Sequence, residues 1–188
     1  MTDTKTDASP FPPLTDAEWP EEAAELLDGF AGRLNVYRTM AHNPALLNAW
    51  APLRQHVVRD SALSPQQSEA AILRSGHRLG SPYEWAQHVS RARACGMSDA
   101  RIDSIRGPVA EMQPDDATIA RAVDALFDDK RLPPATMQAL IALVGRNGMF
   151  DVIATVGFYS TLGYILNSCD TPLDEDIAAE LRDEPFAP

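Results

Sequence analysis

Apolar residues recur along much of the chain at intervals of three and four positions, the spacing of one face of an α-helix. In the segment ALLNAWAPLRQHVVRD (residues 45–60), such a stripe contains Leu46, Trp50 and Leu53. The period-two alternation that is typical of strands is absent, and the β-branched and aromatic run VIATVGFY (152–159) continues a helical register. The sequence therefore predicts an all-α protein.

Serine, proline and glycine mark where the predicted helices begin and end. Ser64 is expected to cap a helix with Pro65 in its first turn and Gln67 completing a capping box, and Gly80 is expected to end it. The next segment, SPYEWAQHVSRARACG (81–96), repeats this pattern. Further helical segments are predicted at 21–30, 33–43, 44–60 with a kink or break at Pro52, 98–106, 117–128, 134–144 and 149–166.

The two chain ends differ from the middle. Residues 1–18 are polar and proline-containing without helical periodicity, which predicts a disordered or extended tail. Residues 183–188 are expected to form a similar tail, and residues 19–182 to form a single helical domain.

The composition of the 188 residues narrows the class of partner. A net charge of −11 without a dense cluster of Lys and Arg argues against nucleic acid or an anionic membrane as a partner. No run of apolar residues approaches the roughly 20 needed to cross a bilayer, and the N-terminus lacks a signal-peptide core, so a cytoplasmic location is expected. The isolated Cys95 and Cys169 suit a reducing compartment and are expected to be small, inert apolar residues.

Glu84 and His88 are the most suggestive chemical pair, because residues four apart meet on one face of a helix. A carboxylate beside an imidazole can serve as a general acid and base if a substrate reaches it. The same Glu84 could instead close a capping box with Ser81, and His88 could be a satisfied core histidine. Both interpretations remain open at this point.

Four neighbouring side chains complete the candidate site. Glu69 is either a surface carboxylate or a partner of His88, and Arg74 is either its structural partner or a binder of a substrate carboxylate. Tyr83 and Trp85 are expected near the wall of a partly apolar pocket. No zinc-type spacing such as HExxH occurs, so no metal is expected.

The segment LSPQQSEAAILRSGHRLGSPYEWAQHVSRARACGMS (63–98) resembles the carboxymuconolactone decarboxylase superfamily, which includes the AhpD-type alkylhydroperoxidases. A looser resemblance covers residues 30–170. In the peroxidase branch, a glutamate and a histidine accompany a CxxC motif. The glutamate and histidine correspond to Glu69 and His88, whereas Ser81 and Glu84 stand where the two cysteines would be. Peroxide reduction by a thiolate is therefore not expected.

The resemblance implies an AhpD-like helical bundle that assembles as a homo-oligomer, a trimer or hexamer. It also implies a cofactor-independent lyase or isomerase that acts on a small organic acid or lactone. Glu84 and His88 would move protons, Glu69 would orient or tune the histidine, and Arg74 would hold a substrate carboxylate. The alternatives are a non-catalytic helical binding or scaffold protein and, more remotely, a redox protein that depends on Cys95.

Overall fold

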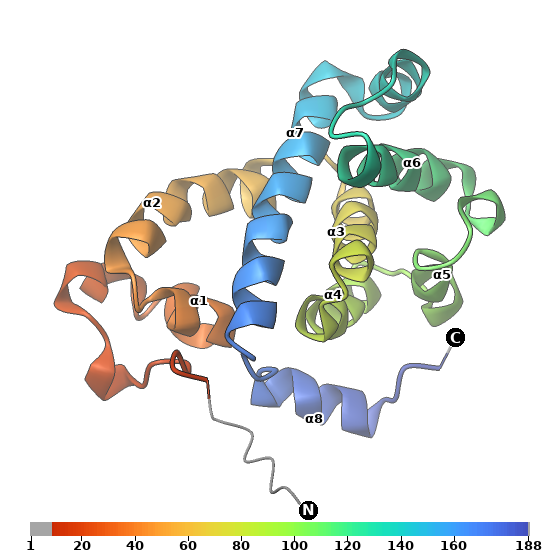
Figure 1. Cartoon of the computed structure of the whole chain (residues 1–188). Coiled ribbons are helices and arrows are strands. Elements are labelled where there is room, and N and C mark those ends of the chain that lie inside the picture. Colours follow the sequence, from red (N-terminus) through yellow and green to blue (C-terminus); the bar gives the residue numbers. More distant parts are fainter. Residues whose placement is uncertain (1–8, 188) are drawn as a thin grey trace, which may run out of the picture.

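The computed structural model describes residues 9–187, and this range is helical with no strand. The prediction of an all-α protein is confirmed. The other helices are arranged around α7, the longest one (Figure 1). The α-helices are α1 (Asn35–Met40), α2 (Pro44–Gln55), α3 (Pro65–Leu79), α4 (Pro82–Ala94), α5 (Asp99–Ser104), α6 (Pro114–Asp128), α7 (Pro134–Ser168) and α8 (Glu175–Asp183). Shorter elements are the 3-10 turns η1 (Asp16–Glu18), η2 (Glu21–Leu26), η3 (Ala31–Arg33) and η5 (Val109–Glu111), and the π-helical turn η4 (His56–Asp60).

Helix α3 begins and ends at the residues expected from the sequence; α4 begins where expected but ends at Ala94, two residues before Gly96. The Ser64 hydroxyl accepts from the backbone N–H of Gln67, and the Gln67 side chain accepts from the N–H of Ser64, which is a complete capping box. Gly80 ends α3 in the left-handed conformation with φ of 59°, and Ser81 caps α4 directly afterwards. The two helices therefore form a tight antiparallel hairpin, which brings their facing side chains together.

Helix α7 separates two parts of the hydrophobic core. On one side it packs against α3 and α6, where Leu73, Ile119 and Val152 are fully buried. On the other side it packs against α1 and α2, where the ring of Trp50 stacks on Phe158 at 4.5 Å between centroids. The first turn of α4 meets this second cluster, and the candidate site lies there.

Gly145 interrupts α7 with a non-helical conformation, φ 74° and ψ 176°, which glycine adopts without strain. The helices predicted at 134–144 and 149–166 correspond to the two halves. By length and composition alone α7 is apolar enough to cross a membrane, which corrects the expectation that no segment approaches that length. Buried core helices meet the same criterion, and α7 buries Val152, Phe158 and Leu162 against its neighbours.

Several boundaries differ from those expected. Pro52 lies inside an unbroken α2, and the segment predicted as a helix over 21–30 is the 3-10 turn η2. Helix α6 begins at Pro114 rather than at residue 117, because Pro114 occupies its first turn. Helix α8 was not expected from the sequence.

Both chain ends make specific contacts where the structure describes them. Of the predicted tail at 1–18, residues 1–8 lie outside the described range, but Arg38 binds the carbonyl of Leu14 and the carboxylate of Asp16. Near the other end, Arg93 donates to the carbonyl of Glu184 at 2.9 Å, and Phe186 packs edge-on against Trp85. The residues just after α8 are thus attached to α4.

Candidate functional site

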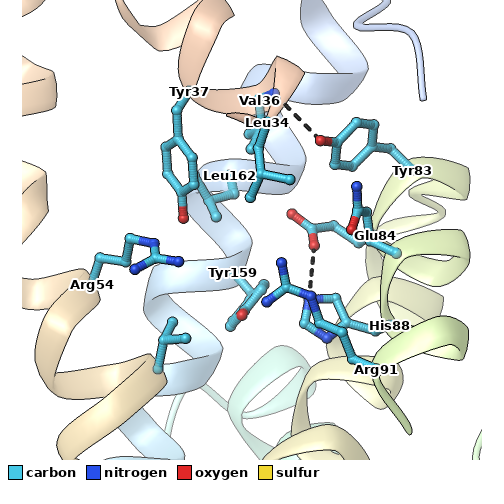
Figure 2. A pocket seen from close by; sticks show the side chains of 12 residues that line it. Leu34, Val36, Tyr37, Arg54, Tyr83, Glu84, His88, Arg91, Tyr159 and Leu162 are labelled. Carbon is cyan, nitrogen blue, oxygen red and sulfur yellow. Dashed lines mark hydrogen bonds and ion pairs between the residues drawn. The ribbon is translucent and has the colours of Figure 1, made fainter. Parts of the chain in front are cut away.

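A small cavity lies between α4 on one side and α1, α2 and α7 on the other (Figure 2). Its volume is about 20 Å³, which is room for a water-sized molecule. The side chains around it are both polar and apolar: Leu34, Val36, Tyr37, Arg54, Val58, Tyr83, Glu84, Gln87, His88, Arg91, Tyr159 and Leu162.

Glu84 and His88 meet on the cavity wall as their spacing predicts. His88 Nε2 lies 3.5 Å from Glu84 Oε2, and each side chain is only 3% exposed. The ring of Tyr159 stands edge-on to the imidazole with centroids 5.0 Å apart. The pair is therefore enclosed by protein rather than displayed on a helix surface.

Glu84 does not close a capping box. The Ser81 hydroxyl accepts from the N–H of Glu84 at 3.4 Å, as expected for a cap, but the N–H of Ser81 already donates to the carbonyl of Gly76 at 3.0 Å. No backbone donor remains there for the Glu84 carboxylate. Its side chain enters the cavity instead, and Oε1 has no hydrogen-bond partner among the described residues. Ser81 therefore caps α4, whereas the Glu84 carboxyl group lines the cavity.

Glu69, on α3, holds the other nitrogen of the imidazole. Its Oε2 lies 2.6 Å from His88 Nδ1, a hydrogen bond across the α3–α4 hairpin. A proton on Nδ1 leaves Nε2 as an acceptor facing Glu84, which is how a carboxylate fixes the tautomer of a neighbouring histidine. Glu69, His88 and Glu84 therefore form a continuous acid–imidazole–acid series that ends at the cavity.

Burial sets the protonation of this series. It raises the pKa of Glu84 to about 8, with the Arg91 charge acting in the opposite direction. Burial also lowers the pKa of His88, and the adjacent Glu69 opposes that decrease. Near neutral pH the cavity therefore contains a protonated carboxyl group beside a neutral imidazole, one proton donor and one acceptor.

Tyr83 lines the cavity as expected, but its hydroxyl has a structural partner. It donates to the carboxylate of Asp174, which also accepts from the Gln87 side chain and from the backbone N–H of Asn35 at 2.7 Å. Asp174 is 4% exposed and immediately precedes α8. This carboxylate therefore fastens α4 to α1, and the sequence analysis did not identify it.

Arg54 and Arg91 also line the cavity, and the sequence analysis identified neither. Arg91 follows His88 by three positions on the same helix, so its place on that face could have been noticed. Arg54 comes from α2 and has no local signal. Together with Val58 they also line an outer cleft of about 390 Å³ that contains Glu69 and Cys95. The small cavity and the larger cleft therefore share a boundary formed by two arginines.

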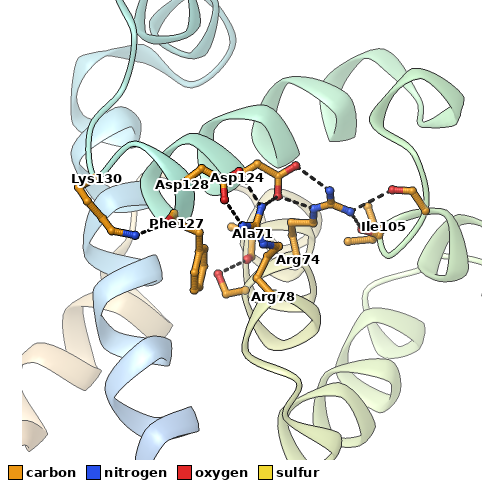
Figure 3. A network of polar contacts seen from close by, with 10 residues as sticks. Ala71, Arg74, Arg78, Ile105, Asp124, Phe127, Asp128 and Lys130 are labelled. Atoms are coloured by element: carbon orange, nitrogen blue, oxygen red, sulfur yellow. Dashed lines mark hydrogen bonds and ion pairs between the residues drawn. The ribbon is translucent and has the colours of Figure 1, made fainter.

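The predicted role of Arg74 in binding substrate is wrong. Its guanidinium makes paired hydrogen bonds to Asp124, at 2.9 and 2.6 Å, and donates to the carbonyls of Ile105 and Gly107 (Figure 3). Arg78 shares the same aspartate. These bonds join α3 to α6, and Arg74 does not line the cavity. They engage Nε and both terminal nitrogens of the guanidinium, the groups that would bind a substrate carboxylate.

Trp85 likewise does not line the cavity, which corrects the second expectation. It lies in a separate surface cleft with His77, Pro82 and Arg106. The reason is its position one residue after Glu84, which turns its side chain about 100° away around the helix. Its packing against Phe186 is structural.

Cys95 lies in the outer cleft with Glu69. The Cys95 thiol donates to the carbonyl of Ala92, and burial raises its pKa, so the thiolate is disfavoured. Between residues 9 and 187, no group of three or more His, Cys, Asp and Glu side chains is arranged to hold a metal ion.

The fold is the AhpD-like helical fold. The chain superposes on the "alkylhydroperoxidase AhpD core: uncharacterized peroxidase-related protein" from Ralstonia eutropha JMP134 with a TM-score of 0.75 and 16% identity, over 90% of this chain and 94% of that one. It also superposes on a cysteine-to-alanine variant of the debrominase Bmp8 in complex with 2,3,4-tribromopyrrole, with a TM-score of 0.69 and 14% identity over 96% and 98% of the two chains. The same debrominase without ligand gives a TM-score of 0.66 at 15% identity over 91% and 95%.

The sequence specifies the family more narrowly. Residues 44–128, from α2 through α6, match the profile of the "Carboxymuconolactone decarboxylase family". Over these residues the chain is similar to that family, and Ser81 and Glu84 stand where the peroxidase branch has its CxxC cysteines. No curated protein matches it.

Proposed function

We propose that the protein is a cofactor-independent lyase or isomerase that moves protons on a small organic acid or lactone. The observation that carries this proposal is the Glu69–His88–Glu84 series, in which a buried carboxyl group without a partner on Oε1 faces a neutral imidazole. Burying an unpartnered carboxyl group is unfavourable for folding, and such arrangements concentrate at functional sites.

The two groups have complementary tasks in this proposal. His88 Nε2 accepts a proton from a substrate carbon or hydroxyl, and Glu69 stabilises the imidazolium that forms. Protonated Glu84 delivers a proton to another carbon. In an isomerisation the formula of the substrate is unchanged; in a decarboxylation the electron pair of the broken C–C bond remains on the substrate, carbon dioxide leaves, and the proton from Glu84 adds to that carbon.

The size of the cavity defines how a substrate would enter. About 20 Å³ holds little more than the reacting end of a molecule, whereas the outer cleft of about 390 Å³ can hold the remainder. We expect the Arg91 side chain, which is half-buried at their boundary, to move aside on binding.

A non-catalytic helical binding or scaffold protein is the second candidate, and the small cavity volume favours it. A thiol-dependent activity has less support, because Ser81 and Glu84 occupy the cysteine positions and the pKa of the Cys95 thiol is raised.

Proton transfer to carbon provides the test. A panel of unsaturated lactones and carboxylic acids, carboxymuconolactone among them, is incubated in D₂O while NMR follows deuterium incorporation and loss of the carboxyl group. Wild-type protein should act on at least one compound, and both His88→Gln and Glu84→Gln should lower the rate by about 100-fold or more. The matched control is His77→Gln, an exposed histidine on α3, which should keep the wild-type rate. No reaction with any compound, or full turnover by His88→Gln, would support the scaffold candidate instead.

A further inference from the structure

Arg54 differs from the other well-buried arginine of the fold in having no carboxylate partner. It is 8% exposed, yet it makes no ion pair among residues 9–187, and its Nε lacks a hydrogen-bond partner. Arg74, also 8% exposed, is paired with Asp124. A buried guanidinium N–H without an acceptor is costly, because that donor has lost its water and has no replacement among the described residues.

Aromatic rings hold Arg54 in place of an anion. Its guanidinium carbon lies 4.0 Å from the ring centroid of Phe30 and 5.6 Å from that of Tyr37. Stacking uses the face of the guanidinium and leaves the N–H groups along its edge available to an acceptor. Figure 2 shows this group extending from α2 toward the centre of the cavity.

Arg91 faces the same space from α4. It forms neither an ion pair nor a side-chain hydrogen bond with the described part of the chain, although it lines both the cavity and the outer cleft. By contrast, Arg78, Arg93 and Arg101 each bind an aspartate. Two unpaired guanidinium groups therefore face each other across the boundary, beside an unpartnered oxygen of Glu84.

We infer that Arg54 and Arg91 together bind the carboxylate of the substrate at the boundary between the cavity and the outer cleft. This inference rests on the proposed function for the identity of the site and adds the substrate class, an anionic acid rather than a neutral lactone. The carboxylate accepts from the edge of Arg54 and from Arg91, so that the rest of the molecule extends toward Glu84 and His88. Bidentate recognition of a planar carboxylate is the interaction for which the guanidinium geometry is best suited.

Comparing the affinity for a carboxylate with the affinity for a neutral molecule of the same shape tests whether the site recognises charge or only shape. The probes are 2-furoate and 2-furamide, titrated calorimetrically into wild-type protein at pH 7. Furoate should bind and furamide should bind at least about 10-fold more weakly, and Arg54→Gln or Arg91→Gln should each weaken furoate binding by about 10- to 100-fold while leaving furamide unchanged. Arg121→Gln, at an exposed arginine of α6, is the matched control and should bind furoate like the wild type.

Two further variants keep the result interpretable. Arg54→Lys retains the charge but not the planar edge, and it should bind furoate more weakly than wild type even if Arg54→Gln fails to fold. His88→Gln should still bind furoate, so that loss of turnover in the proposed reaction and loss of the anion site are separate results. The inference is overturned if wild-type protein does not bind furoate, if the Arg54 and Arg91 variants bind it as wild type does, or if furamide binds equally well.

Discussion

Replacing Glu84 by glutamine should make the protein more stable at alkaline pH and leave it nearly unchanged at acidic pH. Burial raises the pKa of Glu84 from 4.5 to about 8, so the folded state holds a proton that the unfolded chain releases above pH 4.5. Stability attributable to this group is therefore complete below pH 4.5 and is lost as pH rises toward about 8. At about 1.4 kcal/mol per pH unit, that interval corresponds to roughly 5 kcal/mol, an upper bound because water entering the cavity solvates the ionised group.

Glutamine has the same shape as the protonated acid but does not ionise. The assay is urea unfolding of wild-type protein and Glu84→Gln at intervals from pH 5 to pH 9, with the difference in the free energy of unfolding plotted against pH. Groups other than Glu84 largely cancel in that difference. The difference should grow with pH in favour of glutamine by at least about 2 kcal/mol. A flat difference would refute the reasoning, because it would mean that Glu84 ionises equally easily in both states.

The remaining predictions concern helix contacts around the site. Arg74→Met should lower the free energy of unfolding, measured in urea, by about 3 kcal/mol, because Asp124 and the carbonyls that Arg74 binds lose their partner. Furoate affinity should not change. A variant that is fully stable but binds furoate more weakly would instead support a role of Arg74 in substrate binding. Gly163→Ala should destabilise by about 1–3 kcal/mol, because its Cβ would lie 2.8 Å from a methyl carbon of Leu79. Gly157→Ala meets no atom within 4 Å and should instead stabilise by up to about 1 kcal/mol, so equal thermal shifts in both variants would contradict the packing argument. Tyr83→Phe should cost about 1–3 kcal/mol by leaving its carboxylate partner short of a donor, and unchanged unfolding in urea would show that water replaces the hydroxyl.

The sequence correctly predicted the helix ends that depend on residues within a few positions of the end. The cap at Ser64, the glycine end at Gly80 and the break near Gly145 are determined by backbone conformation and by side chains within a few residues. Helix α8 was missed because it is short, nine residues, and its apolar side chains Ile177, Ala178 and Leu181 form too brief a stripe to stand out in the sequence. The proximity of Glu84 and His88 followed from their spacing alone, and that part of the site was predictable.

The parts of the site that were mispredicted depend on partners distant in the sequence. Arg74 was assigned to substrate because its aspartate partner is 50 positions away, and no local pattern announces that pairing. Arg54 was missed for the opposite reason. It is notable because it has no carboxylate partner among the described residues, and only the folded structure shows this. The sequence around an arginine does not predict whether a distant aspartate will pair with it.

The carboxylate of Asp174 also bears on the order in which the molecule is completed. It binds α1 through the backbone of Asn35 and α4 through Tyr83 and Gln87, yet it lies 139 positions after Asn35 and 91 positions after Tyr83. Synthesis proceeds from the N-terminus, so both helices leave the ribosome long before the residue that joins them. The wall of the cavity is therefore fastened only after all the proton-transfer residues have been made, and a chain terminated before this aspartate would contain each of them without the contact that holds their helix to α1.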